Sequence, residues 1–443
     1  MSDLVRTALP IALLLLLFCI EVPVAFALSI AGMFGIYLFT DLTAASSNLA
    51  AIPFTRASTY TLTVVPMFML VGVLVSRSAI LEGAFEVAQR MVKRLPGGMG
   101  VATVMAATFL GGITGSSVAD AATVGRIAIG EMAKRGYDMA YAAAIVAAAA
   151  TVAILLPTSI ALAVFGVVTG VSVGKLLLGG LIPALCTSLA YVCVIVFLGT
   201  RRAEFGRGAG ADFIAPQLGW REFFSVLTGL LLFGIIIGGL YTGIFTPTEA
   251  GAVAATSALI LASAFVVLVA PSGKLGSLRD LLGEGLKEAG SFTAMIFAIV
   301  VGATIFSHFL VMAGVPEAIT QWVMAQNIPP RVVVLVFLLM LLPLGSFVDG
   351  LSMLLIVGPL TYPTVHALGY DGVWYGILFV KLIEIGLIHP PLGLNIYVVC
   401  SLFPELKAER VFVRLLPFLL AELIVIAIIF WFPGIVSLIP AAR

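Results

Sequence analysis

Four short breaks within apolar stretches contain the polar residues that could bind ions or a substrate. The first break, residues 111–120, places glycines just before Ser116, Ser117 and Asp120. Glycine permits a tight chain reversal, and hydroxyl, carbonyl and carboxylate oxygens are hard donors that suit an alkali cation. The segment therefore predicts a hairpin tip that holds a cation. The alternatives are that Asp120 only caps the following helix and that the serines only permit close helix packing.

The second break interrupts the next apolar stretch at Pro157, Thr158 and Ser159. Proline removes a backbone N–H and displaces a carbonyl from the helical hydrogen-bond ladder. The freed carbonyls and the two hydroxyls predict the remaining oxygens of the same cation site. A simple proline kink, with both hydroxyls bonded back to the backbone, is the alternative.

The other two breaks repeat this pair near the C-terminus. A second tip runs from Gly345 to Gly350 and contains Asp349, a carboxylate in apolar surroundings, which is a functional candidate by default. A second broken helix reads His389-Pro390-Pro391-Leu392-Gly393-Leu394-Asn395. The Asn395 amide offers an oxygen to a cation and an N–H₂ to a carboxylate. We therefore expect Gly345, Asp349, Pro390 and Asn395 to bind a second cation.

Helix N-termini at both tips and both breaks would focus positive potential on one central site, which favours an anionic substrate. The expected substrate contacts are Ser159, Lys381, His389 and Gly393. Lys381 and Glu384 are close in sequence on one predicted helix, and a simple pair between them is the alternative role for the lysine. His308, on an otherwise apolar helix, is interpreted as a packing or interface residue.

The elements that must position these residues are membrane helices. Of 443 residues, 61% are hydrophobic and only 10% charged, with a mean hydropathy of +1.20 and a net charge of +1. So few charges exclude a soluble enzyme, a disordered chain and a nucleic-acid-binding protein, and apolar stretches of membrane-spanning length recur throughout. The prediction is an all-α polytopic membrane protein in a lipid bilayer. The stretch that begins at Ala8 is interpreted as a retained membrane segment, broken into two helices at residues 21–23.

An internal repeat organises the chain. One constant offset in numbering, the repeat offset, takes Pro96 to Pro329, Gly112 to Gly345, Pro157 to Pro390, and the triplet 136–138 to 369–371, both Gly-Tyr-Asp. We predict two repeats, residues 1–220 and 221–443. The first contains a re-entrant hairpin at 97–130 and a broken helix at 138–168. The second contains a hairpin at 331–365 and a broken helix at 372–401.

The distribution of basic residues predicts that the two repeats have opposite orientations. Basic residues flank the first hairpin, at positions 77, 90, 93, 94, 126, 134 and 135, whereas only Arg331 flanks the second. Because basic residues favour the cytoplasmic side, the first hairpin should enter from the cytoplasm and the second from the other face. Inverted repeats with broken helices are typical of secondary transporters, whose sites lie near the membrane midplane.

Taken together, several motifs resemble the large membrane subunit of tripartite ATP-independent periplasmic (TRAP) transporters, the DctM type. The similarity covers essentially the whole chain. The motifs are residues 112–120 (GITGSSVAD), 136–138 (GYD), 246–250 (TPTEA), 347–349 (FVD) and 390–395 (PPLGLN). The first and last are specific in combination, although either alone would be weak.

The resemblance implies a secondary active transporter of the bacterial inner membrane that works by an elevator mechanism. It implies sodium as the coupling ion with no other cofactor, a small four-helix membrane subunit, and a periplasmic substrate-binding protein. The implied substrate is an organic anion such as a C4-dicarboxylate, a keto acid or sialic acid. Carried onto this chain, one sodium site involves Ser116, Ser117 and backbone around Pro157. The other involves backbone at 345–349 and 390–395.

Three positions depart from the family pattern. The family usually has threonine at His389, often asparagine at Lys381, and a small or neutral polar residue near Arg126. Because imidazole changes its charge near neutral pH, we expect His389 to make transport partly pH-sensitive.

Two rival functions compete with import. A stand-alone anion exporter or exchanger of related inverted-repeat architecture fits the same elements. An intramembrane hydrolase would have the necessary residue types in Ser117, Asp120, Asp349 and His389. It lacks both the Gly-x-Ser-x-Gly elbow and the HExxH motif, so the sequence predicts a transporter and not an enzyme.

Overall fold

Helices dominate the architecture of this protein. The computed structural model describes residues 2–78, 80–201, 205, 219–268, 278–345, 348–391 and 393–439, and within these ranges there are helices but no strands. Among these described residues, six helices are long and apolar enough to cross a membrane, or seven if one bent pair counts as a single span. The predicted all-α, multi-pass membrane architecture is confirmed.

The N-terminal third begins with two helices joined by a sharp turn. Helix α1 (Asp3–Cys19) ends before Glu21, whose φ of 60° is left-handed, and α2 (Val24–Phe39) follows Pro23. The predicted break at residues 21–23 is therefore confirmed. The sequence did not predict α3 (Leu42–Ala57), which Asp41 caps by accepting a hydrogen bond from the Ala44 N–H.

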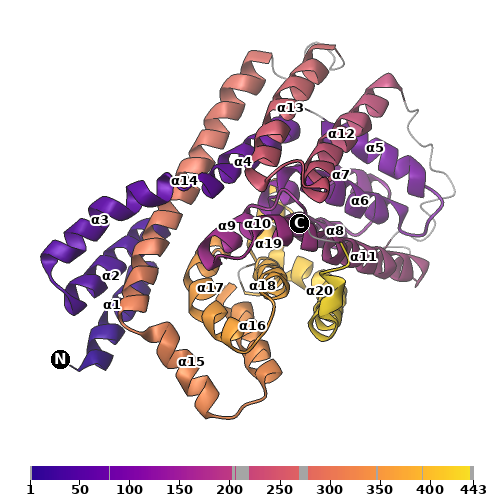
Figure 1. Cartoon of the computed structure of the whole chain (residues 1–443). Coiled ribbons are helices and arrows are strands. Elements are labelled where there is room, and N and C mark those ends of the chain that lie inside the picture. The colour runs from indigo at the N-terminus through magenta and orange to yellow at the C-terminus, as the bar shows by residue number, and fades with distance from the viewer. Residues whose placement is uncertain are drawn as a thin grey trace.

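Helix α2 packs along α14 (Leu278–Met312) through small residues (Figure 1). A Cβ on Gly32 would lie 2.7 Å from the Phe306 backbone, and a Cβ on Gly302 would overlap the Ala25 carbonyl. Small residues let two membrane helices approach closely, and we call this closely packed pair the α2–α14 seam. Helices α1, α2 and α3 lie together beside α14, on one side of the molecule (Figure 1).

The remaining spanning and connecting helices surround the centre. They are α4 (Val64–Arg77), α5 (Ile80–Val92), α10 (Val173–Gly179), α11 (Leu181–Arg201), α12 (Trp220–Thr242), α13 (Pro247–Leu268), α15 (Val315–Ala325) and α20 (Ala408–Trp431).

In the structure, the segments predicted as hairpins and broken helices are each divided into consecutive helices, and these helices gather in the middle of the molecule (Figure 1). Their re-entrant course in the membrane stays a prediction. The first hairpin is α6 (Gly98–Thr114) and α7 (Ser117–Lys134), and the first broken helix is α8 (Met139–Ala150), η2 (Thr151–Leu155) and α9 (Ile160–Thr169). The second hairpin is α16 (Pro330–Gly345) and α17 (Gly350–Ala367), and the second broken helix is α18 (Gly372–Gly386) and α19 (Leu394–Leu402). The first broken helix bends by 42° at its break.

The bounds of these elements keep the repeat offset. It takes both ends of α7 to the two ends of α17, the start of α8 to the start of α18, and the end of α9 to the end of α19. Caps match as well, since Asp138 accepts from the Tyr141 N–H at 2.8 Å and Asp371 from the Trp374 N–H at 2.9 Å. The contacts are also exchanged between the halves: α9 packs against α17, and α19 against α7.

The core lies where the broken helices cross the hairpins. Residues 140–150 of α8 are all buried, mostly alanines, and residues 374–386 of α18 are buried without exception. A helix that is buried on every side has no solvent-facing positions for polar side chains. Charged residues on α18 therefore need partners inside the protein.

Candidate functional site

The first hairpin tip is built by Gly115 and Ser116. Gly115 has a φ of 62°, which ends α6 in the left-handed region, and Ser116 then caps α7 by accepting a hydrogen bond from the Ala119 N–H at 3.4 Å. The cap of α7 is thus Ser116 rather than Asp120. The first residues of α7, just after Gly115, have free backbone N–H groups. These groups and the positive end of the α7 dipole lie at the hairpin tip.

This tip touches the break of the first broken helix. The Thr158 hydroxyl donates to the Gly111 carbonyl at 3.3 Å, and a Cβ added to Gly115 would overlap the Thr158 carbonyl oxygen. Pro157 precedes this contact in a turn between η2 and α9, and Ser159 caps α9 by accepting from the Leu162 N–H at 3.1 Å. The break and the tip are therefore neighbours, with Thr158 and Ser159 fully buried.

Asp120 lies one turn inside α7 and is completely buried. The Thr114 hydroxyl donates to its Oδ1 at 2.6 Å, whereas its Oδ2 has no hydrogen-bond partner among the described residues. A buried carboxylate oxygen without a partner is costly, because burial removes its water and nothing replaces it. That oxygen is available to a cation.

The second tip is arranged in the same way but is more exposed. Asp349 caps α17 by accepting from the Ser352 N–H at 3.0 Å and from the Ser352 hydroxyl, and its side chain is exposed rather than enclosed by apolar residues. Gly345 lies against the second broken helix, where a Cβ on Gly386 would come within 2.7 Å of the Gly345 Cα. Residues 346 and 347 of the predicted tip lie outside the described residues.

The second break holds a buried amide. The backbone turns at a cis Pro390–Pro391 bond and at Gly393, which has a φ of 50° and precedes α19. Asn395, in the first turn of α19, is completely buried, and neither its amide oxygen nor its amide nitrogen finds a hydrogen-bond partner among the described residues. His389 is half-buried, and its Nδ1 similarly has no partner within the described ranges.

A side-chain hydrogen bond connects the first hairpin to the second half of the chain. The Ser117 hydroxyl, on the first hairpin, donates to Glu384 Oε1 of α18 at 3.3 Å. Glu384 is 1% exposed, and its other oxygen has no partner among the described residues. The tip of the first hairpin is thus connected to the broken helix of the second half, and two buried carboxylates each keep an open oxygen there.

Lys381 lies one helical turn before Glu384 on α18, and it forms an ion pair with Glu422 of α20. The lysine also donates to the Thr187 hydroxyl at 2.7 Å, and the Tyr191 hydroxyl donates to Glu422 at 3.2 Å. Both charged groups are almost completely buried. The ion pair of Lys381 is therefore with Glu422, whereas the alternative interpretation from the sequence had paired Lys381 with Glu384.

Sequence reasoning missed Glu422. A signal was present, because it is the one carboxylate in the apolar run 411–439, and an intramembrane charge marks a partner or a pathway. It was missed because the internal repeat offers it no counterpart among the hairpins and breaks.

The fold resembles that of a solved transporter. The chain matches the crystal structure of the Alcanivorax borkumensis YdaH transporter with a TM-score of 0.65 over 88% of this chain and 89% of that one, at 16% sequence identity. The class is thus that of a polytopic helical membrane protein with the fold of that solved structure.

The match to a family model assigns the chain more narrowly than the fold does. Residues 11–435 match the model of the tripartite ATP-independent periplasmic transporter DctM component, and the chain belongs to this family. Among its relatives is the C4-dicarboxylate TRAP transporter large permease protein DctM of Pseudomonas aeruginosa, 35% identical, covering 94% of this chain and 93% of the relative. Another is the sialic acid TRAP transporter large permease protein SiaM of Vibrio cholerae, 32% identical, covering 86% of each chain.

The match confirms the resemblance seen in the motifs. The chain is the large permease subunit of a TRAP transporter, a multi-pass protein of the bacterial inner membrane, and not an enzyme. The intramembrane hydrolase is therefore excluded. The roles of the individual site residues stay predictions.

Proposed function

We propose that this chain imports a small organic anion together with sodium ions, the anion being delivered by a periplasmic binding protein and the chain working beside a small membrane subunit. The relatives support the substrate class, because those named above carry a C4-dicarboxylate and sialic acid. A third relative, from Escherichia coli, is a 2,3-diketo-L-gulonate permease at 28% identity over 95% of this chain. All three substrates are carboxylic acids.

The observation that carries the sodium proposal is the set of buried oxygens without partners among the described residues. Asp120 Oδ2, Glu384 Oε2 and Asn395 Oδ1 are all buried at the tips and breaks. Asp120, Glu384 and Glu422 outnumber the one buried cation of the described ranges, Lys381, so these four groups would carry an excess negative charge when all of them are ionised. A bound cation would offset that charge and satisfy the open oxygens.

Hard oxygen donors also fit sodium chemically. Carboxylates, amide carbonyls and hydroxyls suit alkali and alkaline-earth cations, whereas transition metals prefer nitrogen and sulfur. Among the described residues no group of three or more His, Cys, Asp or Glu side chains is arranged to hold a metal ion. Main-chain carbonyls at Gly111 and Thr158, which the tip and the break bring together, supply further donors.

The matched element bounds favour the inverted-repeat arrangement. Two copies of one hairpin-and-break unit, entering from opposite faces, would place their tips at one midplane site and let that unit move as a body against α2 and α14. This is the elevator motion expected for the family. A stand-alone exporter or exchanger would use the same elements, but the family assignment favours the three-part importer.

The test is uptake into proteoliposomes that contain this chain and its small membrane subunit, with the loaded binding protein outside. We expect an inward sodium gradient to drive uptake and removal of the binding protein to abolish it. Asp120→Asn should raise the sodium concentration for half-maximal uptake by about tenfold or more, since hydrogen bonds and contacts to charged groups contribute roughly 1.5–3 kcal/mol.

Glu131→Gln is the matched control, because Glu131 lies on the same helix and pairs with Lys134 outside the site. It should leave the sodium dependence unchanged. Uptake that follows a proton gradient and ignores sodium would overturn the coupling proposal.

A further inference from the structure

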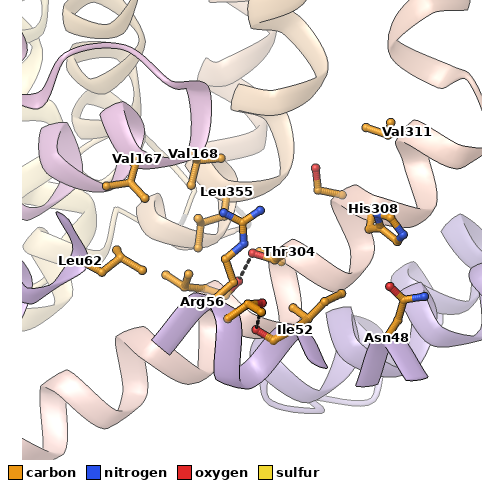
Figure 2. A pocket seen from close by; sticks show the side chains of 14 residues that line it. Asn48, Ile52, Arg56, Leu62, Val167, Val168, Thr304, His308, Val311 and Leu355 are labelled. Atoms are coloured by element: carbon orange, nitrogen blue, oxygen red, sulfur yellow. Dashed lines mark hydrogen bonds between the residues drawn. The ribbon is translucent and has the colours of Figure 1, made fainter. Parts of the chain in front are cut away.

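A cavity of about 430 Å³ lies away from the hairpin tips, between the α2–α14 seam and the broken helices. One wall comes from α3 and α14, the other from the end of α9 and from Leu355 of α17. Figure 2 shows Arg56 rising from α3 into this space toward Leu355, with His308 and Asn48 on the far side. The cavity therefore lies between the α2–α14 seam and the hairpin-bearing part of the molecule.

The lining of this cavity carries positive charge without a counterion. Arg56 and His308 are its two cationic or ionisable groups, and no aspartate or glutamate lines it among the described residues. No ion pair to Arg56 is formed within the part of the chain that the structure describes, and its side chain is exposed to the cavity. Asn48 and Ser307 add polar groups beside the two bases.

The cavity also lies on one particular side of the protein. His308 is close to the C-terminal end of α14, whereas the basic residues Arg279 and Lys287 are at its N-terminal end. By the positive-inside rule, the end that carries the cavity faces the periplasm. An anion that leaves a periplasmic donor reaches this end first.

We propose that this cavity is a reception site for the carboxylate group of the transported organic anion, held by Arg56 and His308 before the anion reaches the hairpin tips. The inference rests on the proposed function for its substrate class. A guanidinium presents paired N–H donors that match a carboxylate, and a second donor opposite fixes its orientation. The volume falls within the range of cavities that hold small-molecule ligands.

The test reads the electrostatic field of the cavity directly. Cys19, Cys186, Cys193 and Cys400 are replaced by serine in the full chain, and Ser307→Cys places one thiol in the lining. Thiol modification is then timed with two methanethiosulfonates of similar size, one carrying a sulfonate and one a trimethylammonium group. We expect the anionic reagent to react faster and the ratio of the two rates to fall by about fivefold or more in Arg56→Gln, because a local positive charge concentrates anions.

Two variants separate charge from structure. Arg56→Lys keeps the charge and should restore most of the ratio, while Arg6→Gln removes an exposed arginine of α1 outside the cavity and should leave the ratio unchanged. A ratio that does not respond to Arg56→Gln would overturn the proposal.

Ligand protection identifies the occupant. Succinate and N-acetylneuraminate, each at millimolar concentration, should slow modification of the thiol at position 307, whereas the same concentration of chloride should not. Protection by nanodiscs of phosphatidylglycerol over phosphatidylcholine, with none by either carboxylic acid, would assign the cavity to lipid and overturn the proposal.

Uptake measurements distinguish this inference from the proposed function. Arg56→Gln should raise the KM for the anion several-fold with little change in maximal rate or in sodium dependence. If no sodium-driven uptake occurs but the carboxylic acids still protect position 307, the coupling proposal fails and the reception site stands. If uptake is sodium-driven and Arg56→Gln changes neither KM nor the labelling ratio, the reception site fails alone.

Discussion

Lys381 and Glu422 are the residues whose burial is hardest to accommodate. Transferring each charge from water to the protein interior costs several kcal/mol, and only their mutual attraction and added hydrogen bonds offset that cost. Thr187 and Tyr191 supply those hydrogen bonds from α11. The network ties α18, which carries Glu384 of the site, to α11 and α20.

Removing one partner of this pair should therefore be much worse than removing both. Lys381→Met leaves Glu422 buried without a cation and should destabilise the protein by about 3–5 kcal/mol. The double variant Lys381→Met, Glu422→Gln removes both charges and should recover most of that loss. Thermal unfolding of the purified protein in detergent measures the difference, and a double variant as unstable as the sum of the two single variants would contradict the account.

Asn395 presents the opposite case, a buried amide that has no hydrogen-bond partner among the described residues and that we propose as a cation ligand. The repeat offset places Leu162 at the equivalent position in the first half, so leucine is the natural substitution for a test. Since an unpartnered buried polar group costs about 1–3 kcal/mol, Asn395→Leu should raise the unfolding temperature of the ligand-free protein.

The same variant should lose the response to sodium. Ligands that bind only the folded state raise its stability, so sodium chloride should stabilise the parent protein over equal choline chloride. In Asn395→Leu we expect at least half of this difference to disappear. An undiminished sodium effect would show that Asn395 takes no part in holding the cation.

At the scale of elements, the contact between a hairpin tip and the neighbouring break is the structural unit of the site. Gly115 is needed twice, for its φ of 62° and because a Cβ would overlap the Thr158 carbonyl oxygen. Gly136 has a similar φ of 76°, but a Cβ added there would meet no atom within 4 Å. Substitutions at these two glycines thus distinguish the effect of backbone strain from the effect of the contact between the tip and the break.

Gly115→Ala should abolish uptake and lower the unfolding temperature, because the new Cβ strains the left-handed backbone and also overlaps the Thr158 carbonyl oxygen. Gly136→Ala should retain uptake and lose only about 1–2 kcal/mol of stability from the left-handed backbone. Uptake assays and thermal unfolding of both variants decide the matter. Equal behaviour of the two variants would mean that the tip does not need its close approach to the break.

The sequence predicted the helices well where glycine or proline residues interrupt an apolar run. Gly-rich tips and Pro-containing breaks within apolar runs placed both hairpins and both broken helices within a few residues of their observed bounds. Helices α3, α5 and α15 were not predicted, because they are short, polar or amphipathic and lack the length of a spanning segment. Their positions depend on packing against other elements, which local sequence does not encode.

Individual site contacts were less predictable than elements. Ser116 and Asp349 lie at helix caps, as tip residues should, but the exposure of Asp349 and the bond from Ser117 to Glu384 depend on how the two halves dock. The partner of Lys381 came from a helix outside the repeat motif. Long-range pairs of this kind are set by tertiary packing and not by spacing along the chain.

At the scale of the whole molecule, the proposed transport site requires two related units that face opposite sides of the membrane. Exchanged packing, with α9 against α17 and α19 against α7, makes each unit depend on the other for its core. Tips that enter from opposite faces would meet near the midplane. The bond from Ser117 of the first tip to Glu384 of the second broken helix already links the two halves beside this proposed site. If both hairpin tips entered from the same membrane face, the site would be open to that face only. Such an arrangement would not support alternating access.

The sidedness of two equivalent positions tests this claim most directly. Lys134 and Ala367 end the second arms of the two hairpins, are exposed, and are related by the repeat offset. Single cysteines at these positions, in the variant without native cysteines, are treated with a membrane-impermeant thiol reagent in vesicles of each orientation. We predict that position 367 reacts only in right-side-out vesicles and position 134 only in inside-out vesicles; reaction of both from the same side would contradict the account.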